Sequence, residues 1–343
     1  MRNRKLIFVS TFVFISAIIF FGCMQLFFNK EGTVPINSTF FVMDTVVDIT
    51  IYTSDKDQAA KALTVVNQTM NDISNKFLDR YNPNSDIAKI NLQAGITKVN
   101  VSEPTIEVIA LCLSLKKPEF DIACAPLIEL WTQAKAEKRV PTKMEISNVL
   151  PLIQQDLIEI DKKNHTVFLP IKGMGIDLGG IAKGYITEKI ADIFKDYNFT
   201  GVLINAGGNI KVLGHKPKKT NWQIGIQNPF NLDKISATVT LSDNETAETS
   251  GNYMRYYEVA GVRYHHLLSP IDGYPVNYNA SVTIISTDSA LADYYSTYIF
   301  LLPSEQGLHV LETTPNIAGI IIDISGNIKV SNSIKEKVTL INE

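Results

Sequence analysis

The sequence predicts an α+β protein in which mixed or antiparallel sheets pack against helices. Helical and strand-like patterns alternate irregularly along the chain, whereas a doubly wound parallel sheet needs regular alternation. Several strand-like runs are separated by short turn segments typical of hairpins, such as residues 162–165 and 206–208. With 343 residues, 45% of them hydrophobic, the chain is long enough to bury a large core.

The N-terminus has the pattern of a targeting segment. Basic residues within the first five positions precede an apolar run from residue 6 to residue 21, which ends at Gly22-Cys23. A small residue before such a cysteine resembles a bacterial lipobox, and this interpretation makes residues 1–22 a leader and Cys23 the lipidated N-terminus. Residues 6–28 are also nearly long enough for an uncleaved anchor helix. Both alternatives place the body of the protein outside the cytoplasmic membrane.

The net charge bears on possible partners, and the cysteine content bears on possible disulfides. The net charge is -3 and no basic tract appears, so nucleic acid is not an expected partner. In the body of the chain, Cys112 and Cys124 could pair, but nothing requires a disulfide framework, and two buried thiols are the simpler interpretation.

The first half of the body reads as a tether followed by mixed elements. The polar stretch 30–38 contains Gly32 and Pro35, so residues 23–38 are expected to tether a domain spanning 39–343. We then expect a β-rich segment at 40–52, helices at 55–76 and from Ser102 to about 115, and a hairpin pairing 157–160 with 167–169.

The second half is richer in strands. We expect strands at 201–205, 209–213, 222–226, 237–241, 281–286, 317–324 and 327–330, a hairpin pairing 253–259 with 262–268, and helices at 289–302 and 305–311. Thr249-Ser250-Gly251 is expected to be a turn of small residues after a strand.

Residues 175–185 form the most distinctive stretch of the chain. One acid, a glycine pair, Lys183 and Gly184 precede an amphipathic run from 186 to 194 with helical spacing. A glycine-bearing turn that leads into a helix N-terminus suits an anionic group, because free backbone N–H groups and the positive end of the helix dipole meet there. The alternative is an ordinary loop whose glycines satisfy backbone geometry alone.

Two further places in the chain, a predicted helix face and a histidine, could carry chemistry. Asp293 and Thr297 lie four residues apart, on one face of a predicted helix, with Ser296 beside them. Such oxygen donors suit a hard cation such as Mg²⁺, although the same pair is also common on solvated helix faces. His266 ends a predicted strand and could be a general base, a partner for a phosphate group or a structural histidine. The chain lacks the Walker A loop, the Rossmann fingerprint, the nucleophile elbow and the zinc-protease motif.

Several motifs in register resemble one family, the ApbE-type FAD:protein FMN transferases. The resemblance extends from Phe41 to about Ser331. It is carried by Met43-Asp44-Thr45, Arg80-Tyr81 with Ser85 and Asn91, Phe120-Asp121, Ala125-Pro126-Leu127 with Leu130-Trp131, Asp177-Leu178-Gly179-Gly180-Ile181-Ala182-Lys183-Gly184, Asn205-Ala206-Gly207-Gly208, Thr249-Ser250-Gly251, His266-Leu267-Leu268-Ser269-Pro270 with Gly273-Tyr274-Pro275, and Ala292-Asp293 with Thr297. Asp44, Ser269 and Asp272 depart from the usual pattern.

The resemblance implies a single ApbE-like, T-fold-like catalytic unit. It implies a Mg²⁺-dependent enzyme that takes FAD as substrate and transfers the FMN part to a threonine hydroxyl of an acceptor flavoprotein, with AMP leaving. A membrane-linked redox subunit or an extracellular flavoprotein would be the acceptor of a lipid-tethered enzyme at the outer face of the bacterial membrane.

The resemblance also assigns roles by position. Metal binding is assigned to Gly180, Asp293, Ser296 and Thr297. Contact with FAD is assigned to Met43, Tyr81, Glu119, Phe120, Asp121, Asp177, Lys183, Thr249, Ser250, Gly251, His266 and Leu267. His266 is expected to assist the acceptor hydroxyl, with Lys183 and Asp293 as the other catalytic residues.

Two other functions stay open at this point. A Mg²⁺-dependent FAD pyrophosphatase would use water in place of the acceptor threonine and yield FMN and AMP. A surface flavin-binding lipoprotein without turnover is the third alternative, and the Asp293–Thr297 pair argues against it because a carrier needs no metal.

Overall fold

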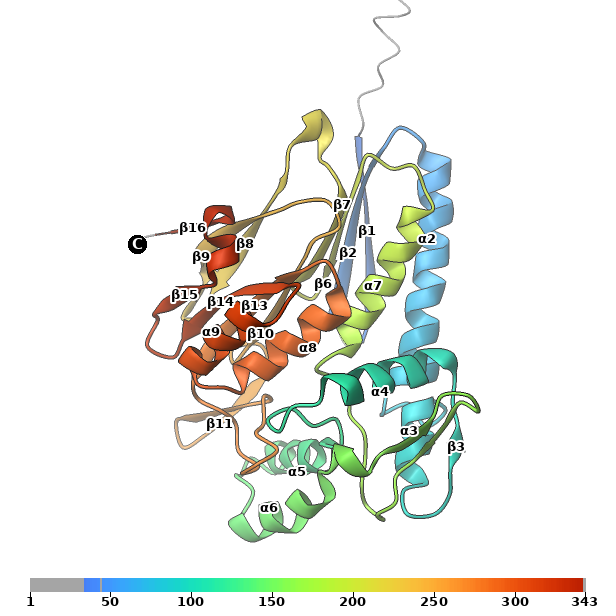
Figure 1. Ribbon diagram of the computed structural model, residues 1–343, viewed down its shortest axis with the longest axis vertical. Coiled ribbons are helices and arrows are strands. Elements are labelled where there is room, and N and C mark those ends of the chain that lie inside the picture. The colour runs from blue at the N-terminus through green and yellow to red at the C-terminus, as the bar shows by residue number, and fades with distance from the viewer. Residues whose placement is uncertain (1–33, 44, 342–343) are drawn as a thin grey trace, which may run out of the picture.

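An eight-stranded sheet forms the centre of the protein (Figure 1). The computed structural model describes residues 34–43 and 45–341. Every neighbouring pair in this sheet is antiparallel, which confirms the α+β class and its hairpin connections. The strands lie in the order β1 (Val34–Val42), β2 (Thr45–Thr53), β6 (Gly201–Ala206), β7 (Asn209–Gly214), β10 (Thr246–Gly251), β13 (Asn279–Ser286), β14 (Ile317–Asp323) and β15 (Ile328–Val330).

Helices cover one face of the sheet (Figure 1). In β2, Val47, Ile49 and Ile51 alternate toward this face and are buried in its core. The first covering helix starts where the Asp55 side chain accepts a hydrogen bond from the Gln58 N–H at 2.8 Å. The four helices are α2 (Lys56–Asn71), α7 (Ala182–Lys195), α8 (Ser289–Phe300) and α9 (Ser304–Thr313).

A second, smaller sheet covers the opposite face. It consists of β16 (Val338–Leu340), β9 (Asn231–Leu241) and β8 (Trp222–Asn228), in that order. Trp222 is buried between the sheets, and its indole N–H donates to the Gly214 carbonyl at 3.1 Å. The central sheet therefore has an apolar layer on each face, as burial of both faces requires.

A lobe of short elements lies below the sheet in Figure 1. It contains α3 (Asp86–Leu92), α4 (Glu103–Leu115), α5 (Ala125–Ala136), α6 (Lys143–Val149) and the strands β3 (Val99–Asn100), β4 (Glu159–Asp161) and β5 (Thr166–Phe168). The hairpin of β11 (Tyr256–Val259) and β12 (Val262–His265) packs on α5 through Trp131, whose indole N–H donates to the Gly273 carbonyl at 2.8 Å. This contact joins two motifs that are far apart in the sequence.

Short helical turns complete the described elements. They are η1 (Asp72–Leu78), η2 (Leu150–Leu152), η3 (Gln155–Leu157), η4 (Pro217–Lys219) and η5 (Asn332–Lys337). None of the described helices is both long and apolar enough to cross a membrane. Cys112 and Cys124 are free.

Three local expectations need correction. Thr249-Ser250-Gly251 is the end of strand β10 and not a turn, because each of these residues pairs with β13. Helix α7 begins at Ala182, so Lys183 and Gly184 lie in its first turn instead of the preceding loop. Strand β1 begins at Val34, inside the expected tether of residues 23–38. The leader of residues 1–22, Cys23 and Asp44 lie outside the described residues.

Candidate functional site

Asp293 is the centre of a buried polar cluster between α7 and α8. The residue is 1% exposed. Its Oδ1 atom accepts hydrogen bonds from Lys183 Nζ at 3.1 Å and Asn209 Nδ2 at 3.3 Å. Its Oδ2 atom accepts a hydrogen bond from the Gly184 backbone N–H at 2.9 Å. A buried carboxylate requires such partners, so the interpretation of Asp293 as a solvated helix residue is excluded.

Gly184 allows the two helices to approach each other at this point. A Cβ atom there would lie 2.1 Å from the Ser289 carbonyl oxygen and 2.6 Å from the Asp293 Cβ. Helix α7 can therefore place its backbone N–H against the carboxylate only where it carries no side chain. The glycine expected to shape a turn instead sets the distance between two helices.

A row of hydroxyl groups continues from Asp293 toward β10. Ser250 Oγ lies 2.8 Å from Ser296 Oγ and 3.3 Å from Thr297 Oγ1. Ser296 also donates to the Asp293 carbonyl oxygen at 2.9 Å and is fully buried. The Thr249 hydroxyl pairs with the Thr283 hydroxyl at 2.9 Å, and the alternation of strand side chains places both on the opposite face of the sheet.

The loop at Gly180 passes directly over Thr297. A Cβ on Gly180 would lie 2.8 Å from a ring carbon of Phe120 and 3.3 Å from Thr297 Cγ2. The Phe120 ring packs in turn on Tyr294, with the ring centroids 4.4 Å apart. The structure thus brings all four predicted metal residues, Gly180, Asp293, Ser296 and Thr297, into one place.

Asp177 anchors a second, more open branch of the site. Arg80 Nε lies 2.6 Å from Asp177 Oδ2, and the Gly179 N–H donates to Asp177 Oδ1 at 2.8 Å. The Tyr81 ring is 64% exposed and lies under the Arg80 guanidinium, 4.1 Å from centroid to carbon. An exposed aromatic ring held by a cation offers a stacking surface for another ring.

The loop around Asp121 is held by backbone contacts. The Asp121 carboxylate accepts hydrogen bonds from the Ala123 N–H at 2.7 Å and the Gln155 N–H at 3.0 Å. Burial raises the pKa of this carboxyl group despite both bonds. Glu119 lies in the same loop. The expected contacts of Glu119, Phe120 and Asp121 with FAD stay predictions.

His265 and His266 differ in burial and in how many ring nitrogens are bonded to the protein. His265 is buried, its Nε2–H donates to the Val276 carbonyl at 2.9 Å, and its Nδ1 accepts from the Leu267 N–H at 3.2 Å. His266 is exposed, and its Nδ1 lies 3.1 Å from the Arg255 carbonyl. A carbonyl oxygen can only accept, so Nδ1 carries the proton and Nε2 keeps its lone pair. Desolvation by the atoms crowded around the ring lowers the pKa of His266 to about 4, although the residue keeps solvent contact.

The Met43 turn lies beside the turn that joins β6 and β7. Gly207, at φ +62°, would place a Cβ 2.2 Å from Thr45 Oγ1, and its N–H donates to the Val46 carbonyl. Asn209 follows this turn and, besides binding Asp293, accepts a hydrogen bond from the Thr249 N–H at 3.3 Å. The β6–β7 turn therefore leads directly to Asn209, which links the Asp293 cluster to β10.

Comparison with known proteins agrees with this arrangement of motifs. The model of the ApbE family matches residues 43–331. The chain belongs to the ApbE family.

Relatives with stated activities support the same assignment. An FAD:protein FMN transferase of Klebsiella pneumoniae is 34% identical over 72% of this chain and 78% of its own length. One from Treponema pallidum is 28% identical over 75% of this chain and 76% of its own. The ApbE protein of Thermotoga maritima superposes with a TM-score of 0.82 at 30% identity, over 89% of this chain and 99% of that protein.

The ApbE motifs that bind no predicted ligand have structural roles. The Asn91 side chain donates to the Ile176 carbonyl at 2.9 Å and accepts from the Ile176 N–H at 2.6 Å, which fixes the strand-like start of the Asp177 loop. Ser269 Oγ accepts hydrogen bonds from the Ile271 and Asp272 N–H groups at 3.2 and 3.3 Å. The serine thus keeps the turn after His266 closed.

Sequence reasoning overlooked three residues of this ApbE site: Arg80, Asn209 and Glu248. Arg80 and Asn209 stand within or beside quoted motifs but received no role. Glu248 is fully buried, and burial together with nearby Asp293 raises its pKa well above the usual range. The alternation of Thr246, Glu248 and Ser250 in one strand could have placed this acid on the face toward α8.

Proton counting also indicates that Glu248 is neutral. Thr246 Oγ1 lies 2.7 Å from the Ile210 carbonyl and 2.7 Å from Glu248 Oε1. One hydroxyl proton cannot serve both oxygens, and the carbonyl must accept. The contact between Glu248 and Thr246 is therefore best formed by a protonated carboxyl group that donates.

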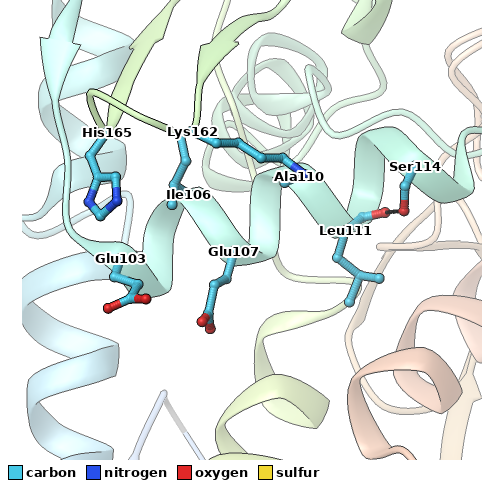
Figure 2. Close-up of a pocket in the computed structure, with 8 residues that line it drawn as sticks. All are labelled: Glu103, Ile106, Glu107, Ala110, Leu111, Ser114, Lys162 and His165. Carbon is cyan, nitrogen blue, oxygen red and sulfur yellow. Dashed lines mark hydrogen bonds between the residues drawn. The ribbon is translucent and has the colours of Figure 1, made fainter.

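A separate hollow lies on the outer face of α4. Figure 2 shows Glu103 and Glu107 on this helix, with Lys162 and His165 from the β4–β5 turn. Its lining is linked to α7, because the Tyr185 hydroxyl donates to Glu107 at 2.5 Å. None of its lining residues belongs to the Asp293 cluster, and we assign it no part in the activity.

Proposed function

We propose that this protein is an FAD:protein FMN transferase. The family match and the activity stated for the Klebsiella and Treponema relatives support this assignment. The observation that carries it is the buried Asp293, which accepts hydrogen bonds from Lys183, Asn209 and the first turn of α7. These groups place positive charge and a backbone N–H donor beside the hydroxyl groups of Ser296 and Thr297, and transfer of a phosphoryl group needs such charge neutralisation.

In the proposed reaction, the acceptor threonine Oγ attacks the phosphorus atom of the FMN phosphate. A new P–O bond forms, the P–O bond to the bridging oxygen breaks, and AMP leaves with that oxygen. The threonine proton passes to His266 Nε2, whose lone pair is free because Nδ1 donates to the Arg255 carbonyl. Tyr81 provides the stacking surface for a ring of the dinucleotide.

The donor set fits a bound Mg²⁺. A carboxylate, the Thr297 hydroxyl and the backbone around Gly180 are hard oxygen donors, which this ion prefers. Among the residues that the structure describes, no group of three or more His, Cys, Asp or Glu side chains is placed to hold a metal. The cation would neutralise charge on the phosphate oxygens. Ser296 is bonded on both sides by protein groups, so Asp293 and Thr297 are the better-placed side-chain ligands.

The test uses purified protein with FAD, Mg²⁺ and an acceptor flavoprotein domain that contains a threonine. AMP should be released, and the acceptor should become a fluorescent band that survives denaturing electrophoresis. Release of free FMN with an unlabelled acceptor would establish the pyrophosphatase instead. Intact FAD would refute both activities.

We also propose that the enzyme is a lipoprotein at the outer face of the bacterial membrane. The support is the sequence alone, in which an apolar run ends at Gly22-Cys23. Acceptors in that compartment would be membrane-linked redox subunits or extracellular flavoproteins. The wild type should incorporate a labelled fatty acid and begin at Cys23 after cleavage of the leader, whereas Cys23→Ala should do neither. A wild-type protein with an intact N-terminus and no incorporated fatty acid would favour an uncleaved anchor helix.

A further inference from the structure

The hydrogen bonds of the Asp293 carboxylate leave no free lone pair for a metal cation beside the Lys183 ammonium group. A carboxylate offers about four lone-pair sites on its two oxygens. Oδ1 accepts from Asn209 at 3.3 Å and from Lys183 at 3.1 Å. Oδ2 accepts from the Gly184 N–H at 2.9 Å and from Lys183 at 3.4 Å. A divalent cation that binds this carboxylate must therefore displace one of these donors.

Lys183 is the donor that can leave. The Gly184 N–H is part of helix α7, and Asn209 is 1% exposed and held at its other end by the Thr249 N–H. The Lys183 side chain is 25% exposed, while that of Asp293 is 2% exposed. A lysine has a long flexible stem and a strongly hydrated ammonium group, so it can exchange this contact for solvent or for another anion.

We propose that Lys183 holds the place of the divalent cation on Asp293 and is released toward the dinucleotide phosphates when the cation binds. The inference rests on the proposed function, since it takes Asp293 as a metal ligand. It gives Lys183 two successive partners. The lysine neutralises a buried carboxylate first, and it then meets an anionic substrate after the metal has taken over that carboxylate. Cation binding would thereby prepare the site for FAD.

Mg²⁺ binding to the full-length protein without FAD, measured by titration calorimetry, tests the displacement. Lys183→Gln removes the competing ammonium and should lower the Kd for Mg²⁺ by roughly tenfold, a change typical for loss of one charged hydrogen bond. Lys183→Arg keeps the charge and can hold both oxygens, so its Kd should stay equal to that of the wild type or rise. Lys189→Gln is the matched control, because Lys189 lies on the same helix but pairs with Glu107 at 2.9 Å.

Chemical labelling of lysines provides a second readout. Reductive methylation of Lys183, quantified by mass spectrometry, should become faster when Mg²⁺ is added, because the amine leaves Asp293. Labelling of Lys189 should not change. A Kd of Lys183→Gln within twofold of the wild type, or slower labelling of Lys183 with Mg²⁺, would overturn the displacement while leaving the transferase intact. Absence of both Mg²⁺ binding and AMP release in the wild type would instead refute the proposed function, and with it this inference.

Discussion

Gly184→Ala is the most direct test of how the two helices build the site. The added Cβ would lie 2.1 Å from the Ser289 carbonyl oxygen, whereas ordinary contacts begin at 3.4 Å, so α7 and α8 must separate by about 1.3 Å (3.4 minus 2.1). Overpacking of this kind costs about 1–3 kcal/mol, partly offset by the higher helix propensity of alanine, worth about 1 kcal/mol. We expect a net loss of at most about 2 kcal/mol in the free energy of unfolding.

The effect on catalysis should exceed the effect on stability. The same movement pulls the Gly184 N–H away from Asp293 Oδ2, now 2.9 Å distant, and shifts the carboxylate relative to Lys183. A displacement of about 1 Å in a catalytic group costs roughly a hundredfold in rate. AMP release from FAD, measured by chromatography, should therefore fall about a hundredfold at saturating Mg²⁺.

Gly307→Ala separates the two effects. In α9 the added Cβ would meet side-chain atoms of Ile299 at 2.8 Å and Ile321 at 3.1 Å, in the core and outside the Asp293 cluster. This variant should lose stability without losing turnover. If Gly184→Ala unfolds at the same denaturant concentration as the wild type and releases AMP at the same rate, the reasoning about the helix approach is refuted.

The remaining predictions each concern one ionisable side chain. Asp293→Asn keeps the side-chain shape but removes the charge, and AMP release should fall at least about a hundredfold; unchanged release would exclude Asp293 as a ligand. His266→Ala should slow flavin transfer about a hundredfold or more, and wild-type transfer should decline as the pH falls through about 4, the lowered pKa of this ring, not near 6.5. Burial lowers the pKa of His265 from 6.5 to about 4, so its neutral ring adds stability above pH 6.5 that is lost as the pH falls toward 4. This loss amounts to about 3 kcal/mol, and urea unfolding of His265→Gln should show a weaker pH dependence across that window. Glu248→Gln should unfold within about 1 kcal/mol of the wild type, because the acid it replaces is already neutral; a large loss in urea unfolding would mean that Glu248 is charged.

Local patterns predicted much of the fold. A helix from Ser102 with Pro104 in its first turn is found as α4, with Ser102 at its N-cap position. Thr249-Ser250-Gly251 was interpreted wrongly because small polar residues are common in turns. In the fold these residues are a strand because β13 pairs with all three, and Ser250 meets Ser296 on α8. Such pairing is set by distant partners and leaves little trace in local composition.

The site was predicted as separate pieces but not as an assembly. The spacing of Asp293 and Thr297 indicated a shared helix face, and this is observed. The burial of Asp293 and its contact with Lys183 could not be read from spacing, since the two residues are 110 positions apart. Asn209 and Glu248 were missed for the same reason. Each lies on a strand, and its role depends on its proximity to Asp293 on a helix that packs against that strand.

The position of Asp293 in the chain also has a consequence for biosynthesis. A nascent chain that ends at residue 288 already contains six strands of the central sheet, namely β1, β2, β6, β7, β10 and β13, but it lacks helix α8. Contacts between residues so far apart form late, after most of the loop-closure entropy has been lost. Lys183 therefore has no carboxylate partner in α8 until synthesis is nearly complete. The polypeptide gains the Lys183–Asp293 pair in one late step, and we expect chains that end before α8 to be inert toward FAD.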